Sequence, residues 1–162
     1  MNLFFDTSAL VKFFHEEEGT DIVTDLILEQ NNEVWISELG RLEFISAVFR
    51  RFRNKELDEE QLNTAVDSFE NQIAGFNVEP LGHAVLEQAE LFIKKYGRTY
   101  GLKALDALHL GAFSLISEKD WSFVVADDNL CRVAEVRTSD LNRKSQSSCA
   151  ILFGKIGLGW TS

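Results

Sequence analysis

Four acidic residues stand where their side chains could do chemistry: Asp6, Glu43, Asp106 and Asp127. Asp6 follows the apolar run 3–5, and Asp127 follows the apolar run 123–125. In an open parallel sheet, ligands bind beyond the carboxyl ends of the strands, so carboxylates at two such ends are candidates for one site. Asp106 and Glu43 lie within apolar helical patterns, where burying an unpaired carboxylate costs several kcal/mol. We therefore expect both to be paired or to bind a cation.

Each acid also has an ordinary structural alternative. Asp6 could cap a helix, Glu43 could be a first-turn acid, and Asp127 could belong to a turn. Asp106 could pair with a nearby lysine or arginine. Considered together, clustered carboxylates repel each other unless cations neutralise them, and an oxygen-only set of ligands suits Mg²⁺ or Mn²⁺ rather than zinc. The acids as a group therefore predict a divalent-cation site.

Short apolar strands that alternate with helices must position these acids. The pattern predicts strands at 3–5, 34–36, 76–78 and 123–125. It predicts helices from Thr7 or Ser8 to Gly19, over 20–30, from an N-cap at Ser37 through Phe52, and from a capping box at 58–61 to 74. Two further helices, over 83–95 and 102–117, are separated by Gly97 and Gly101. Such alternation predicts an α/β fold with a mostly parallel sheet covered on both faces. The apolar run 149–154 is either a last edge strand or an unstructured extension.

Length and composition fit one soluble globular domain: 162 residues, 45% hydrophobic, with a net charge of −10. This acidity excludes a uniformly basic nucleic-acid binder but leaves room for a local basic surface. Arg41, Arg50 and Arg51 belong to such a cluster, and Lys103 to another; they either face solvent or contact phosphates. No basic leader and no apolar run of about 20 residues is present, so we expect a cytoplasmic protein without a membrane segment.

Four motifs follow one another along the chain. They are Asp6-Thr7-Ser8-Ala9-Leu10-Val11-Lys12, Ser37 followed by Arg41-Leu42-Glu43-Phe44, Leu105-Asp106-Ala107-Leu108-His109-Leu110, and Val124-Val125-Ala126-Asp127-Asp128-Asn129-Leu130. In this order and spacing they resemble the motifs of PIN-domain ribonucleases, most closely the VapC-type toxins of bacterial toxin–antitoxin systems. The resemblance covers about residues 1–135 and leaves 136–162 as a C-terminal extension of uncertain structure.

The resemblance implies a three-layer α/β/α sandwich around a short, mostly parallel sheet, and a Mg²⁺-dependent endoribonuclease, with Mn²⁺ as a possible substitute. Asp6, Glu43, Asp106 and Asp127 match the family's metal-binding and catalytic acids, and Ser8 matches its small hydroxyl residue. Such a nuclease hydrolyses an RNA phosphodiester to a 5′ phosphate and a 3′ hydroxyl. The implied partners are an RNA substrate, an antitoxin protein that inhibits the enzyme, and a second copy of the chain.

The sequence departs from the family pattern at three places. Val125 stands where the family often has a hydroxyl residue, Asp128 is a second candidate for the fourth acid, and 135–148 lacks the glycine that usually leads into a last strand. Two alternatives therefore stay open: a catalytically silent PIN-like binding module, and a metal-dependent phosphohydrolase of small molecules. His109, one helical turn after Asp106, is interpreted as a core hydrogen-bonding residue rather than a metal ligand.

Overall fold

Strands and helices alternate along the chain, as the sequence predicts. The computed structural model describes residues 1–15, 18–118, 120–142 and 150–152. The strands are β1 (Asn2–Phe5), β2 (Glu33–Ser37), β3 (Asn77–Glu79), β4 (Trp121–Val124) and β5 (Ala150–Leu152). The helices are α1 (Thr7–Phe14), α2 (Thr20–Leu28), α3 (Glu38–Arg53), α4 (Glu59–Ile73), α5 (His83–Phe92), the π-helical turn η1 (Ile93–Gly97), α6 (Arg98–Tyr100), α7 (Ala104–Ile116) and α8 (Asp128–Asn142).

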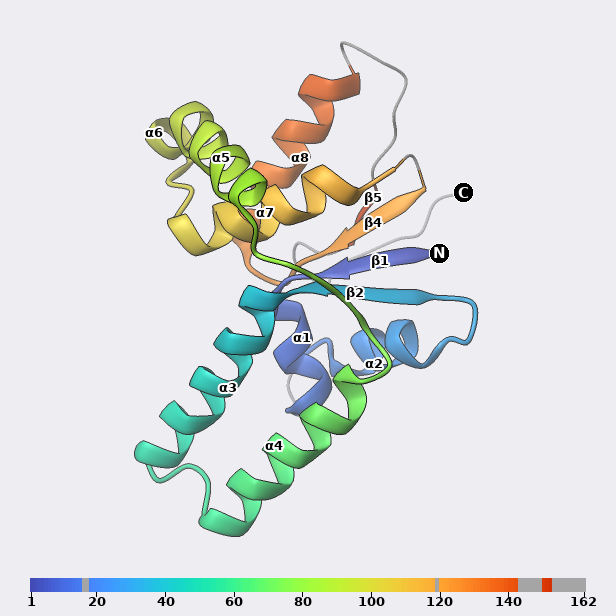
Figure 1. The fold of residues 1–162 in the computed structure, drawn as a ribbon, viewed down its shortest axis with the longest axis vertical. Coiled ribbons are helices and arrows are strands. Elements are labelled where there is room, and N and C mark those ends of the chain that lie inside the picture. The colour runs from blue at the N-terminus through green and yellow to red at the C-terminus, as the bar shows by residue number, and fades with distance from the viewer. Residues whose placement is uncertain (16–17, 119, 143–149, 153–162) are drawn as a thin grey trace.

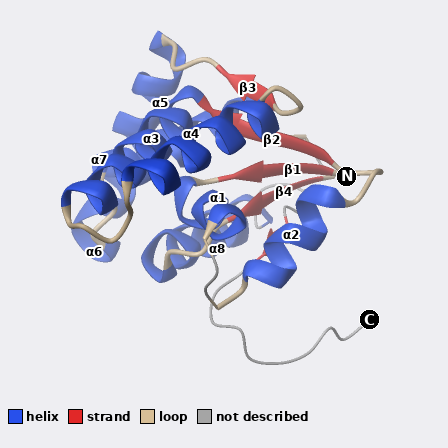
Figure 2. Cartoon of the chain, turned by 90° about the horizontal axis from the view of Figure 1, so that it is seen from below, coloured by secondary structure: helices blue, strands red, loops and turns tan. Residues whose placement is uncertain are grey.

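The strands form one sheet in the order β3-β2-β1-β4-β5, and every neighbouring pair is parallel. Figure 2 shows β3, β2, β1 and β4 lying side by side in that order. At the carboxyl end of β1, Phe5 lies opposite Ile36 of β2 and Val124 of β4. The residues that follow β1, β2 and β4 therefore meet at one edge of the sheet, where α1 and α3 begin (Figure 1).

Helices cover both faces of this sheet because side chains alternate along its strands. Leu3 and Phe5 join a core with α1, α2, α3 and α4, whereas Phe4 joins a second core with α5, α7 and α8. The ring of Phe44 on α3 stacks on Phe69 of α4, with centroids 3.9 Å apart. The observed architecture is the expected three-layer α/β/α sandwich.

Helix N-caps fix how the chain leaves its strands. Asp6 follows β1 and accepts a hydrogen bond from Ala9 N, and Ser37 ends β2 and accepts one from Gly40 N. The predicted capping box also forms, because Asp58 and Gln61 each bond the other's backbone amide. These local signals determine where the helices next to the candidate site begin.

Two predicted helix boundaries are wrong. Helix α1 ends at Phe14 rather than at Gly19, and His15 has an extended backbone. The hydroxyl of Thr20 donates to the His15 carbonyl, and Gly19 (φ 93°) is the N-cap of α2 rather than the end of α1. Gly97 does not break the next helix, because η1 carries it on into α6, and the break falls at Gly101 (φ 66°).

The C-terminal part contributes a strand to the sheet. Of the two alternatives for 149–154, Ala150–Leu152 forms the edge strand β5 on β4, and residues 149, 153 and 154 lie outside the described part. Helix α8 crosses residue 135 and ends at Asn142. The division into a domain over 1–135 and an extension over 136–162 remains a prediction. None of the described helices is long and apolar enough to cross a membrane.

Helices α5 and α7 pack closely at Gly111. A Cβ built on this glycine would lie 3.1 Å from the Val85 carbonyl oxygen and 3.3 Å from the Ala89 amide nitrogen. Both neighbours are backbone atoms of α5, so they can withdraw only if the helix moves. Glycine at this position therefore allows α7 to approach α5 and the sheet.

We predict that Gly111→Ala destabilises the protein. Overpacking costs about 1–3 kcal/mol, which exceeds the roughly 1 kcal/mol that alanine gains by helix propensity. The melting temperature should fall by about 2–4 °C per kcal/mol in thermal unfolding. Gly75→Ala is the control, because its Cβ would meet only the Gln72 carbonyl oxygen at 3.5 Å. A Gly111→Ala protein as stable as the wild type would contradict this account of the packing.

Candidate metal and nucleic-acid site

Asp6 lies at the carboxyl end of the central strand and is almost completely buried, with 4% of its surface exposed. Its amide donates to the Val124 carbonyl at 3.0 Å, which continues the pairing of β1 with β4. Ser8 Oγ lies 2.8 Å from both carboxylate oxygens, and Ala9 N donates to Oδ1. Burial raises the pKa of Asp6, while the charge of His109 and these hydrogen bonds act in the opposite direction.

Ser8 ties the ends of β1 and β4 together. Its hydroxyl donates to Asp6 and accepts the backbone N–H groups of Ala126 and Asp127, both at 2.9 Å. A serine hydroxyl has one hydrogen and two lone pairs, so these contacts use its full capacity. Ser8 therefore places Asp127 beside Asp6.

Asp127 caps α8 as well as facing this edge. Its Oδ1 accepts a hydrogen bond from Leu130 N at 2.8 Å, and the side chain is half-buried. Asp128 is exposed in the first turn of α8. The ordinary alternative expected for Asp127 was a turn residue, whereas the structure shows it as a helix cap. This role leaves the second carboxylate oxygen of Asp127 for other partners.

Asp106 lies half-buried in the first turn of α7. Among the described residues its carboxylate accepts no hydrogen bond. Burial is the largest cause that raises its pKa, and the negative charge of Asp127 and, to a lesser extent, Glu43 adds to it; Lys103 and His109 act against them. Asp106 therefore shares one electrostatic environment with two of the other acids.

Glu43 lies on α3, close enough to Asp106 for its charge to affect the pKa of Asp106. Its Oε2 accepts hydrogen bonds from Thr7 Oγ1 and from His109 Nε2, the latter at 2.7 Å. Burial alone would raise the pKa of Glu43, but the hydrogen bonds from His109 and Thr7 outweigh it and lower the pKa. Glu43 is accordingly held as a carboxylate anion.

His109 hydrogen-bonds within the core, as predicted, through both ring nitrogens. Nε2 contacts Glu43 and Thr7, and Nδ1 lies 3.1 Å from Ser37 Oγ. The sequence predicts no role for Thr7 at the site. For Ser37 it predicts only the role of a helix N-cap. The one available signal was His109 itself, since a histidine on an apolar helix needs polar partners, but the sequence could not identify those partners.

The residues suit a divalent cation by their chemistry. Asp6, Glu43, Asp106 and Asp127 supply only oxygen donors, as Mg²⁺ and Mn²⁺ prefer. Burial and, after it, the charge of Asp127 raise the pKa of Asp106. In the described part of the chain, no three histidine, cysteine or acidic side chains lie close enough together to hold a metal ion as they stand. Protein donors hold Asp6 and one oxygen each of Glu43 and Asp127. The other oxygen of Glu43 and of Asp127 has no donor among the described residues.

The basic candidates lie at different distances from the acids. Lys103 precedes α7 and is close enough to affect the pKa of Asp106, and Arg41 lies two residues before Glu43 and pairs with Glu70 at 3.7 Å. Arg50 and Arg51 lie about two helical turns beyond Glu43, roughly 11–12 Å along the axis. Arg51 pairs with Glu56 at 3.1 Å.

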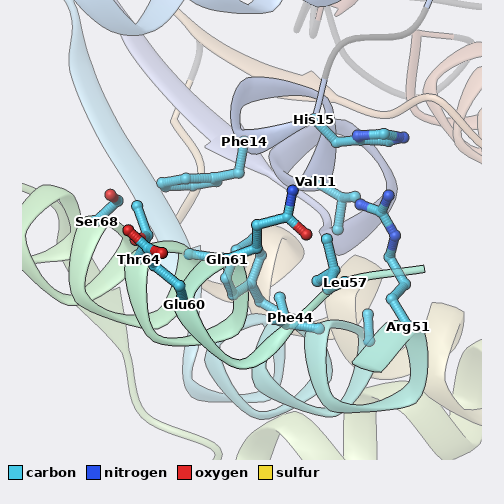
Figure 3. A pocket seen from close by; sticks show the side chains of 13 residues that line it. Val11, Phe14, His15, Phe44, Arg51, Leu57, Glu60, Gln61, Thr64 and Ser68 are labelled. Carbon is cyan, nitrogen blue, oxygen red and sulfur yellow. The ribbon is translucent and has the colours of Figure 1, made fainter. Parts of the chain in front are cut away.

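A separate groove opens between α1, α3 and α4, with a volume of about 480 Å³ (Figure 3). Apolar side chains such as Val11, Phe14 and Leu57 line it, and Arg51 and Glu60 contribute charged groups. None of the four acids lines this groove. It is therefore distinct from the acidic edge of the sheet.

The fold and the carboxylates together define a class: a three-layer α/β protein with an acidic centre at the carboxyl ends of its central parallel strands. The PIN domain family model matches residues 3–136. The chain therefore belongs to the PIN domain family, whose members typically depend on a metal ion.

Several solved structures share this fold at low sequence identity. FitAcB from Neisseria gonorrhoeae has a TM-score of 0.64 at 15% identity, covering 93% of this chain and 96% of that one. Mycobacterium tuberculosis VapC20, a toxin that cleaves the sarcin–ricin loop, has a TM-score of 0.61 at 14% identity, covering 80% and 93%. DNA-bound VapBC from Salmonella typhimurium has a TM-score of 0.58 at 14% identity, covering 94% and 97%. No curated protein matches the sequence of this chain.

We predict that Asp106→Asn stabilises the protein at neutral pH when EDTA removes divalent metal. Below the ordinary pKa of 3.8 the wild-type carboxyl group is protonated both folded and unfolded, so it imposes no penalty. As pH rises from this value through the raised pKa of Asp106 in the folded state, the wild-type protein loses stability. The reason is that the folded state disfavours the ionised carboxylate, whereas the unfolded state does not. The difference in melting temperature between variant and wild type should therefore grow from pH 4 to pH 7.

Asp128→Asn is the matched control, since Asp128 is exposed. It should show little pH-dependent difference from the wild type. Equal behaviour of the two variants would contradict the electrostatic account of Asp106.

Proposed function

We propose that this chain is a metal-dependent endoribonuclease, a VapC-like toxin that hydrolyses RNA phosphodiester bonds. The observation that carries the proposal is the electrostatic position of Asp106 at the end of the sheet where Asp127 follows β4 and Glu43 lies on α3. There Asp106 lies half-buried in the field of Asp127 and Glu43 with no hydrogen-bond donor among the described residues. Such an arrangement is unfavourable for folding alone and suits a protein that binds a cation.

The proposed roles follow from the placement of each residue. Asp6, Glu43, Asp106 and Asp127 would hold Mg²⁺ or Mn²⁺, with Asp128 as a secondary candidate. When bound, the ion would supply Lewis-acid chemistry and lower the pKa of a water molecule. Ser8 keeps the ends of β1 and β4 together and so fixes the spacing of Asp6 and Asp127.

Positive charge beside the acids supports an RNA substrate. Arg41 and Lys103 are exposed and lie within three residues of Glu43 and Asp106 respectively, so either could contact a phosphate next to the cleaved bond. Arg50 and Arg51 would contact RNA further from the scissile phosphate. The net charge of −10 does not prevent this, because the neutralising ion and the local cations set the potential at the site.

An antitoxin and a second copy of the chain are the proposed protein partners. One solved structure of similar fold is a toxin–antitoxin complex from Klebsiella pneumoniae, with a TM-score of 0.54 at 15% identity. An antitoxin segment that covered the acidic edge would exclude RNA from it. A purified complex should therefore be less active than the free chain.

We predict that the purified chain cleaves RNA in Mg²⁺ and that EDTA abolishes cleavage. Asp6→Asn, which retains an N-cap residue, and Asp106→Asn should each reduce the rate by about 100-fold or more, because loss of a ligand should cost at least as much as loss of an outer-shell partner. Gel analysis of labelled RNA would measure the rate, with Asp67→Asn, an exposed acid on α4, as the control that retains most activity.

Two outcomes would separate this proposal from its alternatives. Undiminished cleavage in EDTA, or in both variants, would contradict a metal-dependent nuclease at these acids. A wild-type chain that neither cleaves RNA nor gains thermal stability in Mg²⁺ or Mn²⁺ would favour the silent binding module, since a ligand that binds only the folded state stabilises it by mass action.

We also predict that Arg41→Gln and Lys103→Gln weaken RNA binding in a salt-dependent way. Removal of one cation that touches a phosphate should reduce the slope of log affinity against log salt by about 0.7 for single-stranded RNA. Binding is best measured on an Asp6→Asn background, so that the RNA stays intact. Arg53→Gln, at the far end of α3, is the control. If the slope were unchanged in all three arginine and lysine variants, RNA would bind to a different surface of the protein.

A further inference from the structure

The hydrogen bonds of His109 join three helices and the end of a strand at the acidic edge. His109 stands on α7, and the residue is 2% exposed. Nε2 lies 2.7 Å from Glu43 Oε2 on α3 and 3.1 Å from Thr7 Oγ1 on α1, and Nδ1 lies 3.1 Å from Ser37 Oγ, the last residue of β2. Thr7 and Glu43 are also bonded to each other.

The direction of these bonds follows from the chemistry of the groups. An ionised carboxylate only accepts hydrogen bonds, so Nε2 carries a hydrogen and donates it to Glu43. The Ser37 hydroxyl accepts the Gly40 amide and is left with its own hydrogen for Nδ1. With both ring nitrogens engaged, His109 has no lone pair directed at a metal ion.

The consequence is that hydrogen bonds from the described part of the chain fix one oxygen of Glu43 and not the other. Thr7 and His109 both bind Oε2, and within the described residues Oε1 accepts no hydrogen bond. The carboxylate is thereby oriented, with one oxygen anchored in the buried network and the other unpartnered. A second set of partners that orients a ligating carboxylate in this way commonly changes metal affinity by about 10–100-fold when it is removed.

His109 also links two of the acids across helices. It follows Asp106 by three residues on α7, about one turn, and its ring binds the acid of α3. The buried ring therefore sets the spacing between the backbone that carries Asp106 and the carboxylate of Glu43. Gly40 of α3 lies against this ring, since a Cβ built there would be in ordinary contact with His109 Cε1 at 3.6 Å and with Thr7 Oγ1 at 3.7 Å.

We propose that His109 is a positioning residue of the nuclease site, which orients Glu43 toward the metal ion by donating from Nε2 while Ser37 and Thr7 hold the ring in place. This inference rests on the proposed function. It assigns His109 no contact with the metal or with RNA, and it assigns Thr7 and Ser37 the supporting contacts that keep the imidazole in one orientation.

The test compares Mn²⁺ affinity, measured by electron paramagnetic resonance on the full-length chain, with RNA cleavage. His109→Leu fills the cavity without a donor and should weaken Mn²⁺ binding by about 10–100-fold. His109→Gln can place its amide nitrogen near the Nε2 position and should recover much of the affinity. His109→Asn, whose shorter amide corresponds to the Nδ1 position beside Ser37, should not.

A purely structural role predicts a different pattern. Val23→Ala is the control, because Val23 is buried in the apolar core on α2 and its side chain has no polar atom to join the network. This variant should lower the melting temperature while leaving Mn²⁺ affinity near the wild-type value. If the His109 variants lost affinity only in proportion to their melting temperatures, or if His109→Asn and His109→Gln behaved alike, the positioning role would be wrong.

The two proposals can fail separately. A wild-type chain that bound no Mn²⁺ and cleaved no RNA would overturn the proposed function together with this inference. A wild-type chain that bound Mn²⁺ and cleaved RNA, with His109→Leu equal to it in both, would overturn the inference alone.

Discussion

Like-charged carboxylates at the ends of neighbouring strands repel each other, and burial makes their ionised forms more costly still. This electrostatic constraint accounts for the polar groups around the acidic edge of the sheet. Ser8 and the Ala9 amide hold Asp6, Thr7 and His109 hold Glu43, and the Leu130 amide holds Asp127. Asp106 is the acid for which the described residues provide no such donor, and its pKa is raised by burial and by its neighbours.

The same contacts join elements that are distant in the chain. Ser8 spans β1 and β4, and His109 spans α7, α3 and the end of β2. The apolar cores on the two faces of the sheet hold these elements in register, with Phe4 and Phe5 on opposite faces of the central strand. The polar network therefore forms where two separately packed halves of the molecule meet, and its geometry depends on both cores.

The net charge of −10 conceals how charge is arranged in this protein. Acids gather at the sheet edge, and cations such as Arg41 and Lys103 lie next to them rather than far away. A protein of this kind can be acidic overall and still present a local surface suited to a polyanion once a divalent ion is bound. Total charge alone would have argued against the function proposed for this chain.

The sequence by itself determined the short strands, the N-caps at Asp6 and Ser37, the capping box and the order of the four acidic motifs, because each depends on residues within a few positions of one another. Tertiary structure alone decided three other features. Ala150–Leu152 forms a strand because it pairs with β4. The helical run that begins with α5 continues through η1 to Gly97, and Glu43 hydrogen-bonds to His109 across 66 residues of sequence. Such contacts depend on how separate elements pack, and local pattern carries no information about which distant side chains will meet.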